Sequence, residues 1–168
     1  MKFKHLVLLA AALMMAFNMM SLNVNAATQE EIDLAQGYIF AWTAVMLATG
    51  KTTQEGLSQF TTIASENEFT KAFYSDKWLA ERFNDAMVIF KVQGEGTEGL
   101  IKRMPSLFKS FKKMKLENRV GFMLSLIVMA KHDNSVSEEE ANVIEKIVKV
   151  IDISRDELLM AWMIWIQR

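Results

Sequence analysis

The amino-acid sequence predicts an all-α fold, a compact bundle of about seven helices in a single domain over residues 27–168. Apolar residues recur at helical spacing along most of the chain, and they almost never alternate as they would in a strand. Four segments begin with Ser or Thr followed three positions later by Glu, the pattern of a helix capping box. With 51% apolar residues and no cysteine, the domain must be stabilised by a buried core and not by disulfides.

The N-terminal segment 1–26 has the three parts of a secretory signal peptide. Lys2 and Lys4 make a short cationic start, an apolar stretch covers residues 6–20, and a small residue, Ala26, ends the segment. We expect cleavage after Ala26 and export of the mature chain to the periplasm. Secretion beyond the cell and an uncleaved N-terminal membrane anchor are the alternatives. Because the chain has no cysteine, a lipoprotein anchor is excluded.

Caps and glycines delimit the first four expected helices. These are expected over residues 29–48, 53–65, 67–74 (a short piece) and 77–92. Thr28 and Thr52, each followed three residues later by Glu, open the first two, because such a pair satisfies free backbone N–H groups. Gly50 ends the first helix through its ease at positive φ, and Gly94-Glu95-Gly96 ends the fourth.

The remaining helices are expected over residues 97–114, 117–131, 138–151 and 155–167. Pro105 should bend or stop the first of these, since proline removes one helical hydrogen bond and clashes with the preceding turn. Ser137 and Ser154, each with Glu three residues on, cap the last two. Residues 158–166 are all apolar, so we expect the last helix to be inserted between earlier ones. One exposed aromatic edge is the alternative.

Several function classes are excluded or disfavoured. Without cysteine there is no thiol nucleophile and no cysteine-rich zinc site. The 19 basic and 20 acidic residues give no concentrated basic footprint for nucleic acid. His132, the one histidine left after cleavage, is at a helix end, where histidine commonly offsets the helix dipole. Glu95 and Glu98 are in a glycine-rich turn and are expected to be solvated. No catalytic residue is predicted, and the chain is not expected to be an enzyme.

A faint internal repeat relates two turns that lie about eighty residues apart. Each turn follows an apolar helix and precedes an amphipathic one. When residues 48–57 are set beneath the segment that starts near Lys131, Thr49-Gly50 falls under Asp133-Asn134 and Thr53 falls under Ser137.

This arrangement resembles the tellurite-resistance TerB-like family, in which an apolar helix, an Asp-Gly-like turn, a Ser-x-x-Glu cap and a second helix occur twice. The resemblance spans roughly residues 32–160 and is clearest over 120–158, including the closing segment Val150–Leu158. It implies an all-helical fold of two pseudo-repeats, here degenerate helix-turn-helix units, whose acidic turns are associated with divalent-metal binding. Members of the family are mostly cytoplasmic, so an exported member would be a departure.

Asp133, Glu139 and Glu140 are the candidate metal ligands. The resemblance matches Asp133 and Glu140 to acidic positions of the second turn, whereas the first turn has Thr49 and Gly56 there. Calcium or magnesium is the expected ion, because both prefer several charged oxygens. The alternative is a structural role, in which Asp133 closes the turn and the glutamates favour the positive end of a helix dipole.

Two segments are candidate contact surfaces. The basic, amphipathic segment 102–119 provides Lys109, Lys112, Lys113 and Lys115, and the last helix provides Trp162 and Trp165. A basic amphipathic helix can lie on anionic lipid or face an acidic partner. A surface helix with a solvated face is the ordinary alternative.

These features predict an exported, non-enzymatic helical protein of the cell envelope that binds a protein or the membrane surface. The expected partner is an envelope protein, an anionic membrane surface or a second copy of the chain, and not nucleic acid. A TerB-like divalent-metal-binding or stress-response protein, of the tellurite-resistance type, is the alternative. No cofactor is expected in the first case, and calcium or magnesium is expected in the second.

Overall fold

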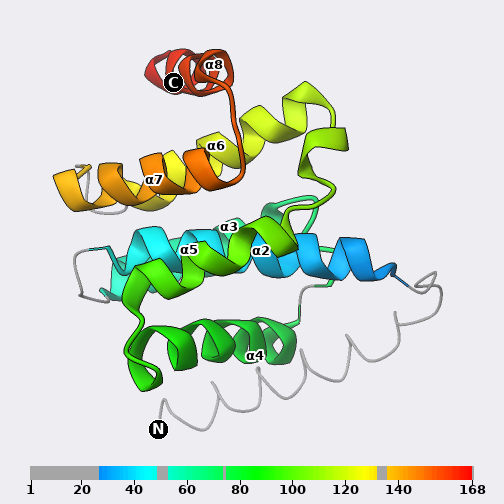
Figure 1. Ribbon diagram of the computed structural model, residues 1–168, viewed down its shortest axis with the longest axis vertical. Helices are drawn as coiled ribbons and strands as arrows, with labels where there is room; N and C mark the ends of the chain where they lie inside the picture. Colours follow the sequence, from blue (N-terminus) through cyan, green and yellow to red (C-terminus); the bar gives the residue numbers. More distant parts are fainter. Residues whose placement is uncertain (1–26, 49–52, 74, 132–135, 168) are drawn as a thin grey trace, which may run out of the picture.

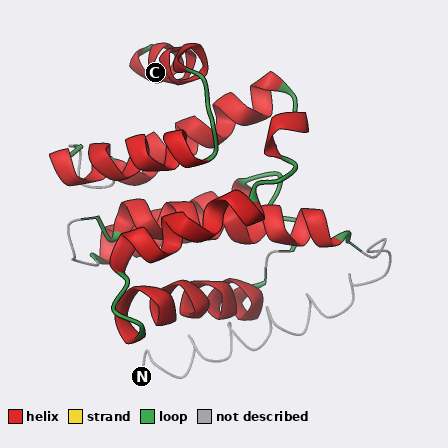
Figure 2. Ribbon diagram, viewed as in Figure 1, coloured by secondary structure: helices red, strands yellow, loops and turns green. Residues whose placement is uncertain are grey.

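Seven α-helices, a π-helical turn and a 3-10 turn make up the part of the chain that the computed structural model describes, residues 27–48, 53–73, 75–131 and 136–167. In chain order they are α2 (Gln29–Met46), α3 (Gln54–Glu66), α4 (Asp76–Met87), the π-helix η1 (Val88–Val92), α5 (Gly96–Leu107), the 3-10 helix η2 (Phe111–Lys113), α6 (Leu116–Ala130), α7 (Glu138–Val150) and α8 (Arg155–Ile166). No strand occurs among these residues (Figure 2). The predicted all-α class is confirmed.

Helix α2 is the centre of the core. Every residue from Leu34 to Met46 except Gln36 is buried, so α2 presents apolar surface in all directions. It packs against α3, α4, α5, α6 and α7. Figure 1 shows α4 on one side of α2 and α5, and α6 and α7 on the other, with α8 beyond them at the end of the long axis. The helices therefore stack in layers around α2.

Aromatic side chains pack between the layers. The Tyr38 ring lies 4.7 Å from the ring of Phe122, 5.5 Å from Trp42 and 5.9 Å from Phe108, measured between centroids. The indole N–H of Trp42 donates a hydrogen bond of 2.7 Å to Ser125 Oγ, which joins α2 to α6. The Tyr38 hydroxyl is buried and has no hydrogen-bond partner among the described residues. Burial raises the pKa of Tyr38, and the nearby Glu68 carboxylate raises it further, so the phenol stays neutral.

The capping boxes predicted from the sequence are confirmed at Thr28, Ser137 and Ser154, each paired with a glutamate three residues on. The cap of α3 is Thr53, whose hydroxyl accepts from the Gly56 N–H at 2.9 Å, and not the predicted Thr52.

Two predicted helical spans are wrong in part. Residues 67–73 form turns and not a short helix, because the Asn67 side chain and backbone accept local hydrogen bonds in place of a helical ladder. Helix α5 ends at Leu107, two residues after Pro105, so the predicted stop near Pro105 is confirmed. The chain continues as turns and η2 where the predicted span ran to 114. Gly94, before α5, and Gly96, its first residue, have φ of 67° and 60°, as expected for residues that break a helix.

Three predictions concern residues outside the described part. These are the signal peptide over 1–26 and the two related turns, at residues 49–52 and 132–135. The duplication that the turns indicate therefore stays a prediction.

Two glycines in helices allow a matched test of the packing. A Cβ at Gly37 in α2 would lie 2.7 Å from Cε2 of the Phe108 ring, which is itself packed against other rings, whereas a Cβ at Gly121 in α6 would meet nothing within 4 Å. We expect Gly121→Ala to raise the free energy of unfolding by about 0.5–1 kcal/mol through helix propensity. Gly37→Ala should lower it by about 1–3 kcal/mol through overpacking. Urea denaturation followed by circular dichroism measures both, and equal signs would contradict this packing of α2 on Phe108.

Candidate functional site

Exposed apolar side chains gather on α8 and at the start of α6. Figure 1 shows α8 at one end of the long axis, beyond α6. Five large apolar residues there are exposed, and we call them the α6–α8 surface: Leu116, Leu159, Met163, Ile164 and Ile166. Beside them lies a groove of about 540 Å³ between the two helices. The groove is lined by Leu116, Glu117, Val120, Gly121, Leu124, Met160, Met163, Ile164 and Gln167. Most of this lining is apolar, which suits a hydrophobic ligand or partner more than a polar substrate.

The expected insertion of α8 between earlier helices is wrong. Among the described helices, α8 packs extensively on α6 alone, with Ala161 fully buried. The opposite side is open, and Leu159, Met163 and Ile166 are 48%, 60% and 73% exposed. The apolar run gave no periodicity from which to tell an inward from an outward side, so the sequence could not show which residues would be uncovered.

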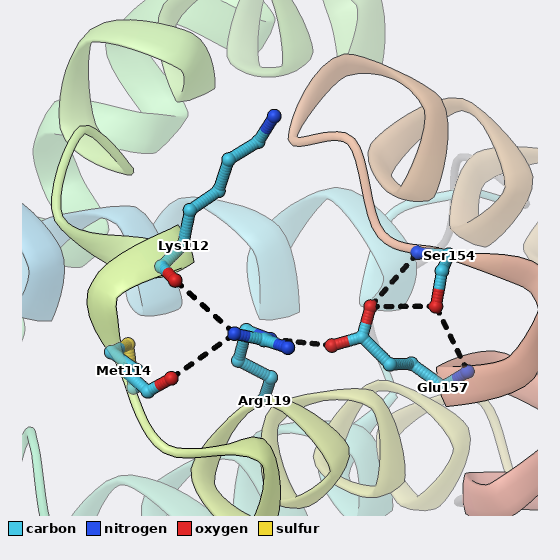
Figure 3. Close-up of polar contacts among 5 residues, drawn as sticks. All are labelled: Lys112, Met114, Arg119, Ser154 and Glu157. Atoms are coloured by element: carbon cyan, nitrogen blue, oxygen red, sulfur yellow. Dashed lines mark hydrogen bonds and ion pairs between the residues drawn. The ribbon is translucent and has the colours of Figure 1, made fainter.

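A polar joint holds the start of α8 against α6 (Figure 3). The backbone N–H and the hydroxyl of Ser154 donate to one carboxylate oxygen of Glu157, at 2.9 and 2.8 Å, and the Glu157 N–H donates back to Ser154 Oγ at 3.2 Å. Arg119 Nε, from α6, donates to the other carboxylate oxygen. The capping box of α8 is thereby tied to the neighbouring helix by an ion pair.

Arg119 also fixes the connection that leads into α6. Its Nη1 donates to the carbonyl oxygens of Lys112 and Met114, at 3.2 and 3.1 Å (Figure 3). Close by, the Lys112 ammonium pairs with Asp152, which has a φ of 58° in the turn between α7 and α8. One ion pair thus joins the α5–α6 connection to the turn that leads into α8, and a second joins α6 to α8.

Glu157 is an acid whose environment favours the charged form. Burial alone would raise the pKa of the Glu157 carboxyl, but hydrogen bonds from the Ser154 backbone, the Arg119 guanidinium and the Ser154 hydroxyl outweigh burial and lower it. Since the carboxylate is bonded on both oxygens, it serves as a structural anchor and not as a proton donor.

The structure places the four predicted lysines in the connection between α5 and α6. Lys109, Lys113 and Lys115 are exposed and form no ion pair with a described residue, whereas Lys112 pairs with Asp152. Lys115 directly precedes Leu116, which lines the groove. The basic segment and the apolar surface therefore meet at the start of α6.

Of the two tryptophans predicted as contact residues of α8, only Trp162 has a described side chain. Trp162 is partly buried and packs against the core, and the side chain of Trp165 lies outside the description. Sequence reasoning missed Leu159, Met163 and Ile166. Their spacing of four and three residues places them on one side of α8, but every residue from 158 to 166 is apolar, so this spacing gave no signal in the sequence.

The predicted metal ligands are only partly described. Asp133 lies outside the described residues, and Glu139 is exposed. Glu140 is 3% exposed, and its carboxylate accepts hydrogen bonds from the Ser137 N–H at 2.8 Å and the Ser137 hydroxyl at 3.0 Å. Within the described ranges, no three His, Cys, Asp or Glu side chains are grouped so that they could hold a metal ion. The part of the site that is described is a helix cap.

Glu95 and Glu98, the carboxylates considered for acid-base work, are both engaged in ion pairs. Arg103 donates to Glu95 at 2.9 Å and lowers the pKa of the Glu95 carboxyl, and Lys146 from α7 pairs with Glu98. Neither carboxylate lines the α6–α8 groove.

None of the described helices combines the length and the apolar character that a bilayer crossing requires.

Stability in acid should report on the polar joint. Because the folded-state pKa of Glu157 is lowered, its contribution to stability is present above the ordinary value of 4.5 and is lost as the pH falls below it. Glu157→Gln should lower the free energy of unfolding by about 1–3 kcal/mol at neutral pH and lose less stability on acidification than the wild type. Urea denaturation at a series of pH values measures this. Asp156→Asn, an adjacent exposed site, is the matched control, and parallel pH curves for Glu157→Gln and the wild type would contradict the assignment.

None of the protein-family models, characterised proteins and solved structures with which the chain was compared matches it. The resemblance of residues 120–158 to the TerB-like family therefore stays a prediction, and function has to be argued from the surface itself.

Proposed function

We propose that this chain is an exported, non-enzymatic helical protein of the cell envelope that acts by binding a partner through the α6–α8 surface. The outward apolar side of α8 is the observation that carries the proposal. Complete burial of a Leu, Ile or Met side chain contributes about 1.5–3 kcal/mol. Leu159, Met163 and Ile166 are about half exposed or more, so much of that stabilisation is left for a partner to supply.

The contrast with α7 supports a role beyond folding. In α7 the side chains of Val143, Ile144 and Ile147 are buried, while Glu138 and Glu139 are exposed, as in an ordinary amphipathic surface helix. α8 departs from that pattern, because large apolar side chains occupy its solvent side. Contiguous apolar patches on a soluble domain commonly mark interaction sites.

The polar joint supports a fixed binding face. Arg119 and Ser154 together bond both oxygens of Glu157, so the first turn of α8 is oriented by directional contacts. A surface that is held in one orientation before binding loses less conformational entropy when a partner docks.

A binding role also agrees with the chemistry of the chain. There is no cysteine nucleophile, and the candidate acid-base carboxylates, Glu95 and Glu98, are neutralised by Arg103 and Lys146. Export to the periplasm is supported by the signal-like segment 1–26, with its cationic start, apolar stretch and small residue at position 26.

Fractionation of cells that make the protein tests this proposal. We expect a chain processed near residue 26, as read by mass spectrometry, that sediments with the envelope. The double variant Met163→Asp, Ile166→Asp should move the protein to the soluble periplasmic fraction, since charged side chains on this face oppose burial against a partner.

Val92→Asp is the matched control, because Val92 in η1 is 78% exposed, similar to Ile166 at 73%, and lies on another element. It should sediment like the wild type. An unprocessed protein, or a double variant that sediments as well as the wild type, would sink the proposal.

The TerB-like metal-binding function is the alternative, and the effect of substituting Glu140 distinguishes the two functions. If Glu140 acts as the cap of α7, Glu140→Ala lowers the free energy of unfolding by about 1 kcal/mol whether or not calcium is present. We expect this outcome, with no calorimetric heat on addition of calcium or magnesium. A loss of stability that appears only with calcium, together with heat that Asp133→Asn abolishes, would favour the metal site. Glu138→Ala, at an exposed position in the same first turn of α7 that is not a candidate ligand, is the control for a loss of charge alone.

A further inference from the structure

We propose that the partner of the α6–α8 surface is an anionic membrane, on which Leu159, Met163 and Ile166 enter the interface while Lys109, Lys113 and Lys115 meet the lipid headgroups. This inference rests on the proposed function and names its partner class. It is carried by the shape of the surface, by its place in the molecule and by its charge.

The apolar side chains are arranged as in a helix that lies on a membrane. Leu159, Met163 and Ile166 follow one another at intervals of four and three residues and therefore project from one side of α8. All three are exposed, and the side of α8 that carries Ala161 is buried on α6. A helix of 12 residues is about 18 Å long, enough to lay three large apolar side chains into the interface.

The place of α8 in the molecule allows a shallow insertion. Helix α8 lies at the end of the long axis, beyond the layer of α6 and α7 (Figure 1). An interfacial helix buries its apolar side by roughly 5–10 Å at the boundary between headgroups and acyl chains. The end of the molecule can reach that depth while the core around α2 remains above the bilayer.

The charge of the α5–α6 connection, which the Lys112–Asp152 ion pair joins to the turn before α8, favours an anionic surface. Lys109, Lys113 and Lys115 are exposed, without an ion pair to any described residue, whereas Lys112 and Arg119 in the same region are paired with Asp152 and Glu157. The chain as a whole has a net charge of −1, so the basic character is local. Glu117 and Asp156 are also exposed in α6 and α8, as is the basic residue Arg155.

A second copy of the chain fits this charge less well. A symmetric dimer uses the same patch on both partners, so it would bring two sets of unpaired lysines to one interface. An anionic bilayer instead supplies charge opposite to that of the lysines. Each lysine held near such a surface strengthens binding by about fivefold.

Co-sedimentation with vesicles tests the inference on protein purified from the producing cells. We expect binding to vesicles of phosphatidylglycerol and phosphatidylcholine, weak binding to phosphatidylcholine alone, and loss of binding as salt is raised. Lys113→Glu with Lys115→Glu should weaken binding by at least about 25-fold, and Met163→Asp with Ile166→Asp by at least about tenfold. Val92→Asp should bind like the wild type. Circular dichroism checks that each variant is folded.

Three outcomes would overturn the inference. The protein could ignore both kinds of vesicle, bind both equally well, or form a dimer that Met163→Asp dissociates while vesicles stay unbound. If the protein ignores vesicles but the Met163→Asp, Ile166→Asp variant is no longer retained in the envelope of cells, the proposed binding function stands. Its partner is then a protein or a second copy. If the protein ignores vesicles and the Met163→Asp, Ile166→Asp variant is retained in the envelope like the wild type, both proposals fail.

Discussion

Burial of α2 on all sides is the constraint on which the rest of the structure depends. A helix whose residues from Leu34 to Met46 are almost all apolar cannot lie on a surface, so other helices have to cover it in every direction. Five helices do so, and the rings around Tyr38 fix how closely they approach. With no disulfide available, this single core supplies the stability of the domain.

The features that could be predicted from the sequence are those that depend on residues close together in the chain. Helix starts at Thr28, Ser137 and Ser154 depend on side chains three residues away, so a local pattern reveals them. The turns at residues 67–73 come from hydrogen bonds of Asn67 that the spacing of apolar residues does not reveal. The place of α8 depends on packing between distant segments. A helix that is apolar all round has no preferred face in its sequence, and only the position of α6 decides which of its residues are covered.

The candidate site shows the same limit. The basic segment was recognisable from its composition, but its function depends on which lysines are already paired, and the partner of Lys112 is forty residues away in the chain. Likewise Glu140 could be read as a ligand or as a cap, because both roles need a carboxylate at the start of a helix. The hydrogen bonds to Ser137 give its carboxylate a structural use, and the candidate surface that remains is apolar, with exposed lysines in the connection that leads into α6.

Because α8, among the described helices, packs extensively on α6 alone, its outer residues evolve under weaker constraints than those of the core. Substitutions in α2 disturb the core, so folding itself limits change there. The outer side of α8 is free of that limit, and its residues can vary with little effect on the fold. Apolar residues retained at positions 159, 163 and 166 in related chains would therefore record selection for the proposed contact and not for folding.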